Sequence, residues 1–595
     1  MNNDHTLSNP TIDISSYSFM SKPIGTSKDN IICLTEDGFS KPIGTFDKSN
    51  RIAELTTSLK DKILIINMSN FDLLGNNYSI QSDFSETLIF ICENLQNIVI
   101  DSIDFISNST CIELFKSNKN ITIKNCNFTN SKIGLLSLES ENLTICNNSF
   151  FNIHHGITLV GCNNTCINCN SFFENIIATY LYKSNINTNI ITNIYNDCIE
   201  GITLYKDNNL NKIYKNTFKS NILFSMNFGI RLFYGNGYNI ISENLIIHNN
   251  SIIKKSEDNN KLYFIGIYFE NNFNILNEIS NNKIIVKNNN YELKGSSSID
   301  VRLYGIAIFS DHSQIEIFNN HIAISNNKFN ILGSEKQNVL ITNIFMKNNY
   351  KNRIYSNTCH TIKNKILFSE NNISVLISSI NIDKQNSSLI IKNNQLFILK
   401  NILIPSANQN IFYSLIISPI IVCLENTNID IINNNIEMNF NTLGINSAIF
   451  VNKSNFGINV LNNFVSNLDG HAIVLNEDNI ANTVQYNRLE NITGLGICLL
   501  NSNHSNIIKD NFMKNIKSTS LLLSIYNLSN IISNNYFENN YRSIYILPFN
   551  NQYNTINYNK FNNNNNNLLV SSNLNNYIFE NLVKLKNDNL KVYDS

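Results

Sequence analysis

Charged residues are scarce in this chain of 595 residues, and the two signs cancel. Only 15% of the residues are charged, and 44 Lys and Arg stand against 45 Asp and Glu, which gives a net charge of -1. Without a net field or a Lys/Arg run, the chain lacks the usual attraction to nucleic acid or to an anionic membrane surface. We therefore expect no nucleic-acid partner.

Neither a signal peptide nor a long apolar run is recognisable. The first ten residues are polar, no charged-plus-apolar leader follows them, and no stretch of 18 apolar residues occurs. These absences predict no membrane insertion and a cytoplasmic or virion location. Without a leader, the 12 cysteines are interpreted as mostly free thiols. Tryptophan is absent too, while asparagine and isoleucine dominate, a bias that an AT-rich genome also produces.

What the sequence does contain is a short repeat. An aliphatic residue is followed by Asn and then by Phe or another apolar residue, as in Ile532-Asn535-Phe537. The large apolar member recurs after 22 residues at Phe128, Phe150 and Phe172, and after 24 residues at Met513, Phe537 and Phe561. A second phrase, Gly-Ile-x-Leu, runs in phase with the first, as at Gly201-Ile202-Thr203-Leu204.

Short alternating strands at this period cannot bury an apolar face alone, but stacked coils cover one another and form a continuous core. The period is too long for hexapeptide helices, and the chain lacks a leucine-rich-repeat skeleton. The sequence therefore predicts an all-β, single-stranded, right-handed parallel β-helix, a solenoid of roughly 18 coils.

These repeats resemble the parallel β-helix (PbH1) repeat family of the pectate-lyase-like, or pectin-lyase-like, superfold. The segment from His471-Ala472-Ile473-Val474-Leu475 to Phe512 is similar to repeats of the nitrous-oxide-reductase maturation β-helix proteins. The resemblance covers about residues 96–590 and implies the fold, whereas activity does not follow because many functions share the architecture. A copper-delivery role like that of the maturation proteins is disfavoured by the scarcity of His and Met, and we expect no cofactor.

The recurring asparagines have a structural explanation. If the stacking is right, one turn carries a row in which each amide donates to the oxygen of the next coil. The members of this row are Asn216, Asn244, Asn282, Asn320 and Asn357. The cysteines Cys162, Cys166 and Cys169 have a spacing that superficially suggests zinc, but four convergent ligands are missing. We interpret them as stacked core thiols and expect no metal.

The repeat also divides the chain. Residues 1–60 lack the phrase and carry Ser-Lys-Pro-Ile-Gly-Thr twice, at 21–26 and 40–45, which indicates an attachment or capping segment. Residues 61–95 are predicted to be the entry cap, 96–590 the β-helix and 591–595 a tail. Between about residues 247 and 436 the period lengthens to 37 or 38 residues, which predicts lateral insertions in the middle coils. The apolar insert Ile402-Leu403-Ile404-Pro405 indicates extra strands.

Six residues are weak candidates for catalysis. Asp300 and Arg302 lie on the same side of a strand because the side-chain period is two. Asp311 and His312 follow on the same coil, and Asp469-Gly470-His471 is similar to the Gly-His-Gly element of polygalacturonase-like enzymes, whose other partners are missing. Each is better explained as a solvated surface charge or a turn residue.

Two functions remain open. The first is a non-catalytic scaffold or recognition protein on a particle or cell surface, monomeric or trimeric, with a polysaccharide or glycan as its candidate ligand. The alternative is a carbohydrate-active lyase, hydrolase or epimerase that uses outer-face carboxylates.

Overall fold

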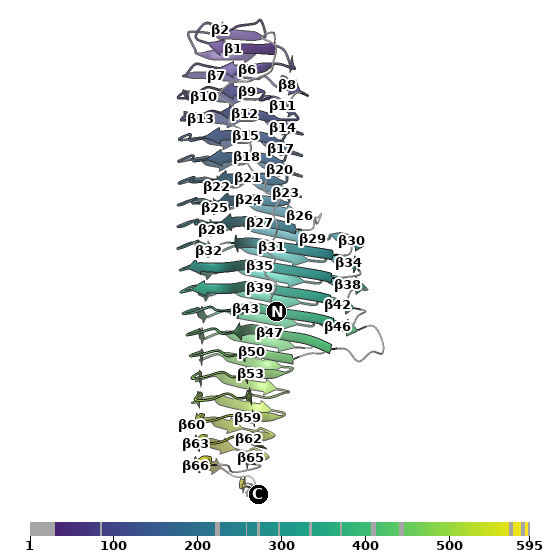
Figure 1. Ribbon diagram of the computed structural model, residues 1–595, viewed down its shortest axis with the longest axis vertical. Helices are drawn as coiled ribbons and strands as arrows, with labels where there is room; N and C mark the ends of the chain where they lie inside the picture. Colours follow the sequence, from purple (N-terminus) through teal and green to yellow (C-terminus); the bar gives the residue numbers. More distant parts are fainter. Residues whose placement is uncertain are drawn as a thin grey trace.

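The chain winds into a rod of stacked coils (Figure 1). The computed structural model describes residues 30–83, 86–220, 226–256, 259–270, 274–295, 298–332, 336–368, 372–405, 412–439, 445–570, 575–584 and 590–592. Each regular coil contributes one strand to each of three long, almost wholly parallel sheets, which hold 22, 21 and 20 strands among these residues. We call them sheets 1, 2 and 3 in that order. The predicted right-handed parallel β-helix is confirmed.

Sheet 1 bears the residues discussed below. Its strands, from the first coil to the last, are β2 (Gly38–Phe39), β1 (Ile31–Thr35), β6 (Ile63–Ile66), β9 (Ile89–Ile91), β12 (Thr110–Leu114), β15 (Ile133–Leu138), β18 (His155–Val160), β21 (Ile177–Tyr182), β24 (Glu200–Tyr205), β27 (Met226–Phe233), β31 (Asn259–Glu270), β35 (Ser298–Ser313), β39 (Lys336–Tyr350), β43 (Asn372–Lys384), β47 (Phe412–Leu424), β50 (Ile445–Lys453), β53 (His471–Glu477), β56 (Ile497–Asn501), β59 (Thr519–Ile525), β62 (Arg542–Phe549), β65 (Asn566–Val570) and β68 (Leu590–Val592). Sheet 2 runs from β3 (Gly44–Asp47) to β66 (Tyr577–Phe579), and sheet 3 from β5 (Leu59–Lys60) to β67 (Leu582–Lys584).

Alternation along each strand builds the core. In β13 (Lys119–Lys124) of sheet 2, Ile121 and Ile123 are buried, while Thr122 between them points outward. Equivalent aromatic rings of sheet 3 stack from coil to coil with centroids 4.6–4.9 Å apart, close to the spacing of neighbouring strands. This aromatic stack comprises Phe105, Phe128, Phe150, Phe172, Tyr195 and Phe218.

Asparagine amides line the turn between sheets 2 and 3. The Asn244 amide nitrogen donates to the Asn282 amide oxygen at 3.0 Å, and Asn282 donates to Asn320 at the same distance. The same amides also donate to backbone carbonyls of neighbouring coils, as Asn282 does to Ile241 at 2.8 Å. The residue before each of these asparagines has a positive φ, for example Asn281 at 55°. A single residue in this left-handed conformation bends the chain, so that the side-chain amide of the following asparagine points into the rod.

The middle coils are wider than the rest. Their extra residues form a fourth, five-stranded parallel sheet, sheet 4, on one side of the rod (Figure 1). Its strands are β30 (Ile252–Ser256), β34 (Asn290–Lys294), β38 (Lys328–Leu332), β42 (Lys365–Phe368) and β46 (Ile402–Pro405). Tyr291 and Phe329 of this sheet are fully buried and join the main core, with Val301 and Val339 of sheet 1. The predicted lateral insertions are therefore present, and they widen the core instead of hanging from it as loops.

The stack of coils starts before residue 96. Strand β1 pairs in parallel with β6, so coil-like pairing begins at Ile31. Two antiparallel pairs, β1 with β2 and β3 with β4 (Ile52–Leu55), cover this end, which shields an open sheet edge. The second Ser-Lys-Pro-Ile-Gly-Thr copy contributes the buried Ile43 here, whereas the first copy lies outside the described residues. No helix within the described ranges is long and apolar enough to cross a membrane.

Candidate functional site

Polar groups of the middle coils gather on the outer face of sheet 1, over β31, β35 and β39. Asp300 of β35 accepts hydrogen bonds from the Tyr263 hydroxyl and from Asn338 Nδ2, the latter at 2.9 Å. The guanidinium of Arg302 lies two residues along the strand, with Nη2 2.9 Å from Asp300 Oδ2. We call these four residues, Tyr263, Asp300, Arg302 and Asn338, the middle patch.

The middle patch is rigid but open to solvent in part. The side chains of Asp300 and Arg302 are 20% and 31% exposed, while Tyr263 is buried. The Arg302 guanidinium lies 4.9 Å from the centre of the Tyr263 ring, a cation–π contact. Burial raises the pKa of the Tyr263 phenol, which keeps it a hydrogen-bond donor. The patch therefore presents an amide, a guanidinium and a carboxylate in fixed positions.

A second cluster lies on the same face, toward the N-terminal end. Arg231 of β27 is 3% exposed and binds Glu200 of β24 at 2.6 Å and Glu270 of β31 at 2.8 Å. The rings of Phe228 and Phe233 enclose the guanidinium, with centroids at 4.4 and 3.9 Å. Burial raises the pKa of Glu270, although Arg231 opposes this shift. Burial lowers the pKa of Arg231, but Glu200 and Glu270 outweigh it, so the net shift is upward and the group stays cationic.

The sequence interpretation missed Arg231 and Glu270. A signal was available: Arg231 occupies the variable position of a Gly-Ile-x-Leu phrase, where the neighbouring coil has Thr203. That position points outward on a strand whose other residues are apolar except Asn227. An arginine there needs a buried carboxylate partner, and two are supplied by adjacent coils.

Asp311 and His312 are separated from the middle patch. Asp311 is exposed, with a φ of 37°, whereas His312 is fully buried in the asparagine-lined turn between sheets 1 and 2. There the backbone N–H of Asn274 donates to His312 Nδ1 at 3.2 Å. Burial lowers the pKa of His312 to about 3, so the ring is neutral at ordinary pH. His312 thus occupies a position that neighbouring coils fill with asparagine.

Asp469 and His471 lie at the start of β53. Thr493 donates to Asp469 at 2.9 Å, and the backbone N–H of Leu495 donates to His471 Nδ1 at 2.9 Å. Burial lowers the pKa of His471. Five coil steps, or about 24 Å, separate β53 from β35. Asp311 lies about 35 Å along β35 from Asp300. The six candidates therefore form three separate sites, and their catalytic role stays a prediction.

Among the residues that the structure describes, the cysteines and acidic side chains form no cluster that could hold a metal ion. All 12 cysteines are free thiols, and no three His, Cys, Asp or Glu side chains within the described ranges converge as metal ligands. Cys162 is buried and contacts Ser137, while Cys169 faces Thr192 at 3.3 Å. Burial raises the pKa of Cys162, which disfavours the thiolate that a soft metal requires.

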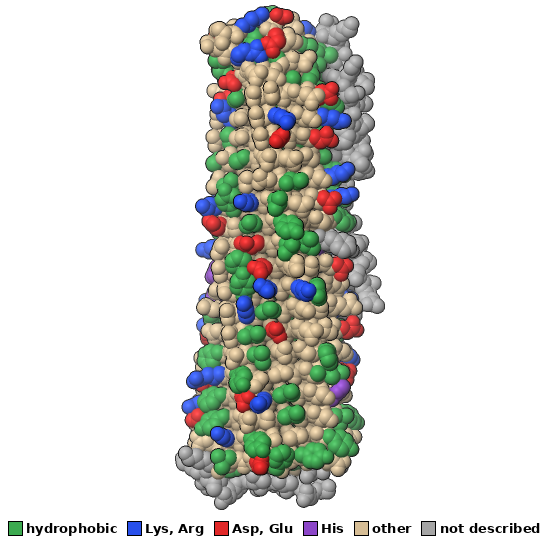
Figure 2. Space-filling view, turned by 90° about the vertical axis from the view of Figure 1, so that its left-hand side faces the viewer, with side chains coloured by type: hydrophobic (Ala, Val, Ile, Leu, Met, Phe, Trp, Pro, Cys, Tyr) green, Lys and Arg blue, Asp and Glu red, His purple; other side chains and the backbone are tan. Residues whose placement is uncertain are grey.

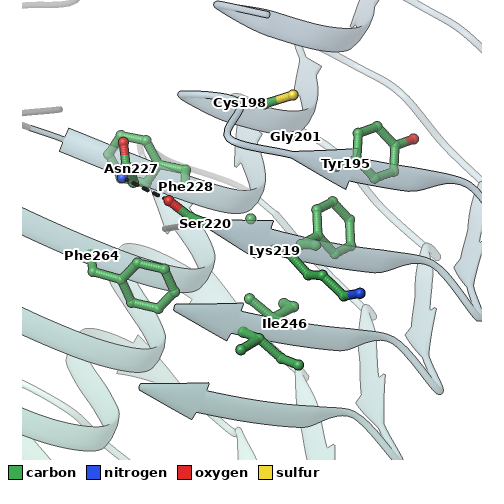
Figure 3. A pocket seen from close by; sticks show the side chains of 12 residues that line it. Tyr195, Cys198, Gly201, Lys219, Ser220, Asn227, Phe228, Ile246 and Phe264 are labelled. Carbon is green, nitrogen blue, oxygen red and sulfur yellow. Dashed lines mark hydrogen bonds between the residues drawn. The ribbon is translucent and has the colours of Figure 1, made fainter. Parts of the chain in front are cut away.

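A small cavity lies inside the rod where the short coils give way to the long ones (Figure 3). Its volume is about 20 Å³, and it is lined by Tyr195, Phe218 and Ile246 among others. The aromatic stack ends at Phe218, and the next coil substitutes the smaller Ile246. The gap holds one water at most, so it is a packing defect and not a ligand pocket.

The flank of the rod over sheet 2, on the left in Figure 1, carries no concentrated charge among the described residues. Figure 2 shows isolated Lys, Arg, Asp and Glu side chains along this flank, with no large area of one sign among the described residues. Several form pairs between coils, such as Arg353 with Glu316 at 3.3 Å. This distribution agrees with the net charge of -1.

A family model described as the periplasmic copper-binding protein NosD matches residues 49–276, which is less than half of the chain. No curated protein matches the chain. The predicted cytoplasmic or virion location is wrong, because the matching family is a periplasmic one. That prediction rests on the absence of a recognisable leader and on the AT-rich composition, and both are weak evidence about location.

Several solved structures are similar in fold. DFA-IIIase from Arthrobacter chlorophenolicus A6 is 10% identical, with 45% of this chain and 72% of that chain covered and a TM-score of 0.28. A periplasmic alginate epimerase is 8% identical, with 65% and 79% covered and a TM-score of 0.24. An α-1,3-glucanase from Streptomyces thermodiastaticus is 11% identical, with 65% and 68% covered and a TM-score of 0.23. These likenesses carry no argument about activity. The chain is a right-handed parallel β-helix repeat protein, and its repeats over residues 49–276 resemble those of the NosD family.

Proposed function

We propose that this protein is a non-catalytic recognition rod that binds a polysaccharide through the middle patch. The observation that carries the proposal is the Asp300 carboxylate, which three neighbours hold in place. Three neighbours, Tyr263, Arg302 and Asn338, already donate to it or pair with it. A general acid or base must exchange its proton with the substrate, and a carboxylate held this way is poorly suited to that role.

The same arrangement suits recognition of sugar hydroxyl groups. A hydroxyl both donates and accepts, so it needs acceptors and donors side by side. Asp300 Oδ1 takes one short hydrogen bond, from Asn338, and can accept a second one, while Arg302 and Asn338 supply donors from strands about 4.8 Å apart. Because their mutual contacts fix these side chains, little rotamer freedom is lost when a ligand binds.

A linear ligand also fits the geometry of the rod. Successive coils repeat the same strand positions, so a chain-like ligand lying along the axis meets an equivalent surface at every step. Half-buried Leu340 and Leu376 continue this face next to the patch, and apolar side chains can contact the C–H faces of a sugar ring. The binding surface in this proposal runs from β31 to β43.

A glycan array combined with a depolymerisation screen tests the proposal. We expect the protein to bind a polysaccharide without releasing new chain ends. Asp300→Ala and Asn338→Ala should each weaken binding at least tenfold. The matched control is Arg353→Ala, which removes another intercoil ion pair on sheet 2 of the same region and should leave binding unchanged. Cleavage that Asp300→Ala abolishes, or the lack of any bound glycan, contradicts the proposal.

A further inference from the structure

Two cysteines lie next to each other on the outside of the rod, at the turn between sheets 2 and 3. Cys146 ends β16 (Thr144–Cys146), and in the next coil Cys169 directly follows β19 (Cys166–Asn168). Strand pairing places Cys146 opposite Asn168, so Cys169 is one coil step and one residue away from Cys146. The Cys146 side chain is half-buried, and Cys169 is exposed. We call Cys146 and Cys169 the thiol pair.

Equivalent positions in other coils bring their side chains into direct contact. Two coils earlier, Asp101 occupies the position of Cys146 and Asn125 the position of Cys169. There the Asn125 amide donates to Asp101 Oδ1 at 2.8 Å. The backbone of the second position is the same in both coils, with a φ of 54° at Asn125 and 55° at Cys169. The turn therefore directs the two side chains of the thiol pair toward each other as well.

The same contact recurs near the other end of the rod, where the Gln485 amide donates to Asp510 Oδ2 at 3.0 Å. The contact thus follows from the turn and not from one particular pair of side chains. Strands of neighbouring coils are about 4.8 Å apart and consecutive Cα atoms about 3.8 Å, which puts the Cα atoms of Cys146 and Cys169 roughly 6 Å apart. Disulfides usually join Cα atoms that are about 4.4–6.8 Å apart. The thiol pair therefore meets the distance requirement of a disulfide.

A third thiol, Cys166, is close to the thiol pair but outside bridging distance. It lies opposite Thr144, diagonally across from Cys146, so the two Cα atoms are about 8 Å apart. From Cys169 it is separated by three residues of extended chain, or about 10 Å. Burial raises the pKa of Cys166, and the two thiols of the pair raise it further, which agrees with three thiols close together. Cys166 is therefore a neighbour of the pair that cannot take part in its bond without movement of the backbone.

We propose that the thiol pair is a redox site that closes to a disulfide between two coils by exchange with a small-molecule disulfide. The exposed Cys169 thiolate attacks one sulfur of the small disulfide, whose S–S bond breaks and releases one small thiolate. The Cys146 thiolate then attacks the Cys169 sulfur of the mixed disulfide and expels the second small thiolate. The pair loses two protons and two electrons, and the small disulfide takes them up as it becomes two thiols. The new bond ties β16 to β19 outside the core.

Mass spectrometry of the full-length chain, reduced and then treated with oxidised glutathione, tests this site. After free thiols are alkylated and the chain is denatured, chymotrypsin cleaves behind Phe150 and Phe172, which separates Cys146 from Cys166 and Cys169. We expect the two peptides to be joined by a disulfide within one molecule, and dithiothreitol should separate them again. Fragmentation of the joined peptides should place the bond at Cys169.

Serine variants assign the bond to its two thiols. Cys146→Ser and Cys169→Ser should each abolish the linkage and leave a glutathione adduct on the remaining thiol, because the second exchange step lacks its partner. Ser102 occupies the Cys169 position in another coil, with a φ of 58°, so the turn accepts serine. The matched control Cys166→Ser should form the linkage to the same extent as the original chain. Absence of a linkage within one molecule of the original chain, or a linkage that requires Cys166, overturns the proposal.

Discussion

Arg231 holds Glu200 and Glu270 at the same time, with Nη1 2.6 Å from Glu200 and Nη2 2.8 Å from Glu270. Both carboxylates are almost fully buried, so Arg231→Met leaves two negative charges close together without the cation that neutralises them. We expect a loss of roughly 3–5 kcal/mol in the local free energy of unfolding. Hydrogen exchange of β24, β27 and β31 measures it, since long repeat arrays do not unfold in one step.

The control for this substitution is Arg353→Met, which breaks an exposed pair. Arg353 is 56% exposed and lies 3.3 Å from Glu316, and such pairs contribute about 0–1 kcal/mol. Converting Arg231, Glu200 and Glu270 together to Met, Gln and Gln should recover much of the lost stability. Equal effects at Arg231 and Arg353 would show that burial of the cluster contributes nothing.

Two buried tyrosines predict opposite outcomes of the same substitution. The Tyr291 hydroxyl is buried in sheet 4 and has no hydrogen-bond partner among the described residues, whereas the Tyr195 hydroxyl lies 3.2 Å from Thr179. Tyr291→Phe should therefore stabilise the middle coils by about 1 kcal/mol or more, and Tyr195→Phe should destabilise its coil by about 1 kcal/mol. Hydrogen exchange of the coils that hold the two tyrosines measures the change, and destabilisation by Tyr291→Phe contradicts the expectation.

The solenoid could be predicted from the sequence because its evidence is periodic. Inward residues such as Phe150 and Asn244 recur with every coil, so a few of them fix the phase of many strands. The wider middle coils follow from the longer period. Local patterns of this kind survive insertions because each coil contacts only its neighbours.

The site could not be predicted in the same way. The cluster around Arg231 joins three strands that are separated by different lengths of chain. Tyr205 pairs with Phe233, which is 28 residues later, whereas Phe233 pairs with Glu270, which is 37 residues later. Those intervals depend on loops without a periodic signal. The burial of His312 could not be predicted for a related reason: the register shifts between Phe309 and His312, which moves the histidine from an apparent outer position into the buried turn.

The asparagine row makes a direct prediction about stability. Asn320 Oδ1 accepts from the backbone N–H and the amide of Asn282, each at 3.0 Å, and its own Nδ2 donates to the carbonyl of Ile279 at 2.9 Å. Asn320→Leu has nearly the same volume but leaves these buried groups without partners. Each costs about 1–3 kcal/mol, so the coil should lose several kcal/mol. The control Asn330→Leu, on the outer side of β38, should cost less than 1 kcal/mol, and equal losses contradict the role of the row.

Three buried histidines predict how stability depends on pH, and one of them, His312, lies in the asparagine-lined turn between sheets 1 and 2. Burial lowers the pKa of His312 to about 3 and those of His155 and His248 to about 4. In the unfolded chain a histidine titrates near pH 6.5. Above that pH both states are neutral and nothing is lost. Below it only the unfolded chain takes up the proton, so the folded state loses about 1.4 kcal/mol per pH unit for each histidine until the folded pKa is reached.

His312→Asn should remove one of these three contributions. An asparagine at this position restores the amide found in the preceding coil at Asn274 and in the following coil at Asn349, and it eliminates the buried Nε2 that has no partner among the described residues. The variant should be at least as stable at pH 7. Between pH 6.5 and 4.5 its free energy of unfolding should fall by about 2–3 kcal/mol less than that of the original chain. Hydrogen exchange of β35 and its neighbouring strands at both pH values measures the difference, and parallel losses would mean that His312 is already protonated in the fold.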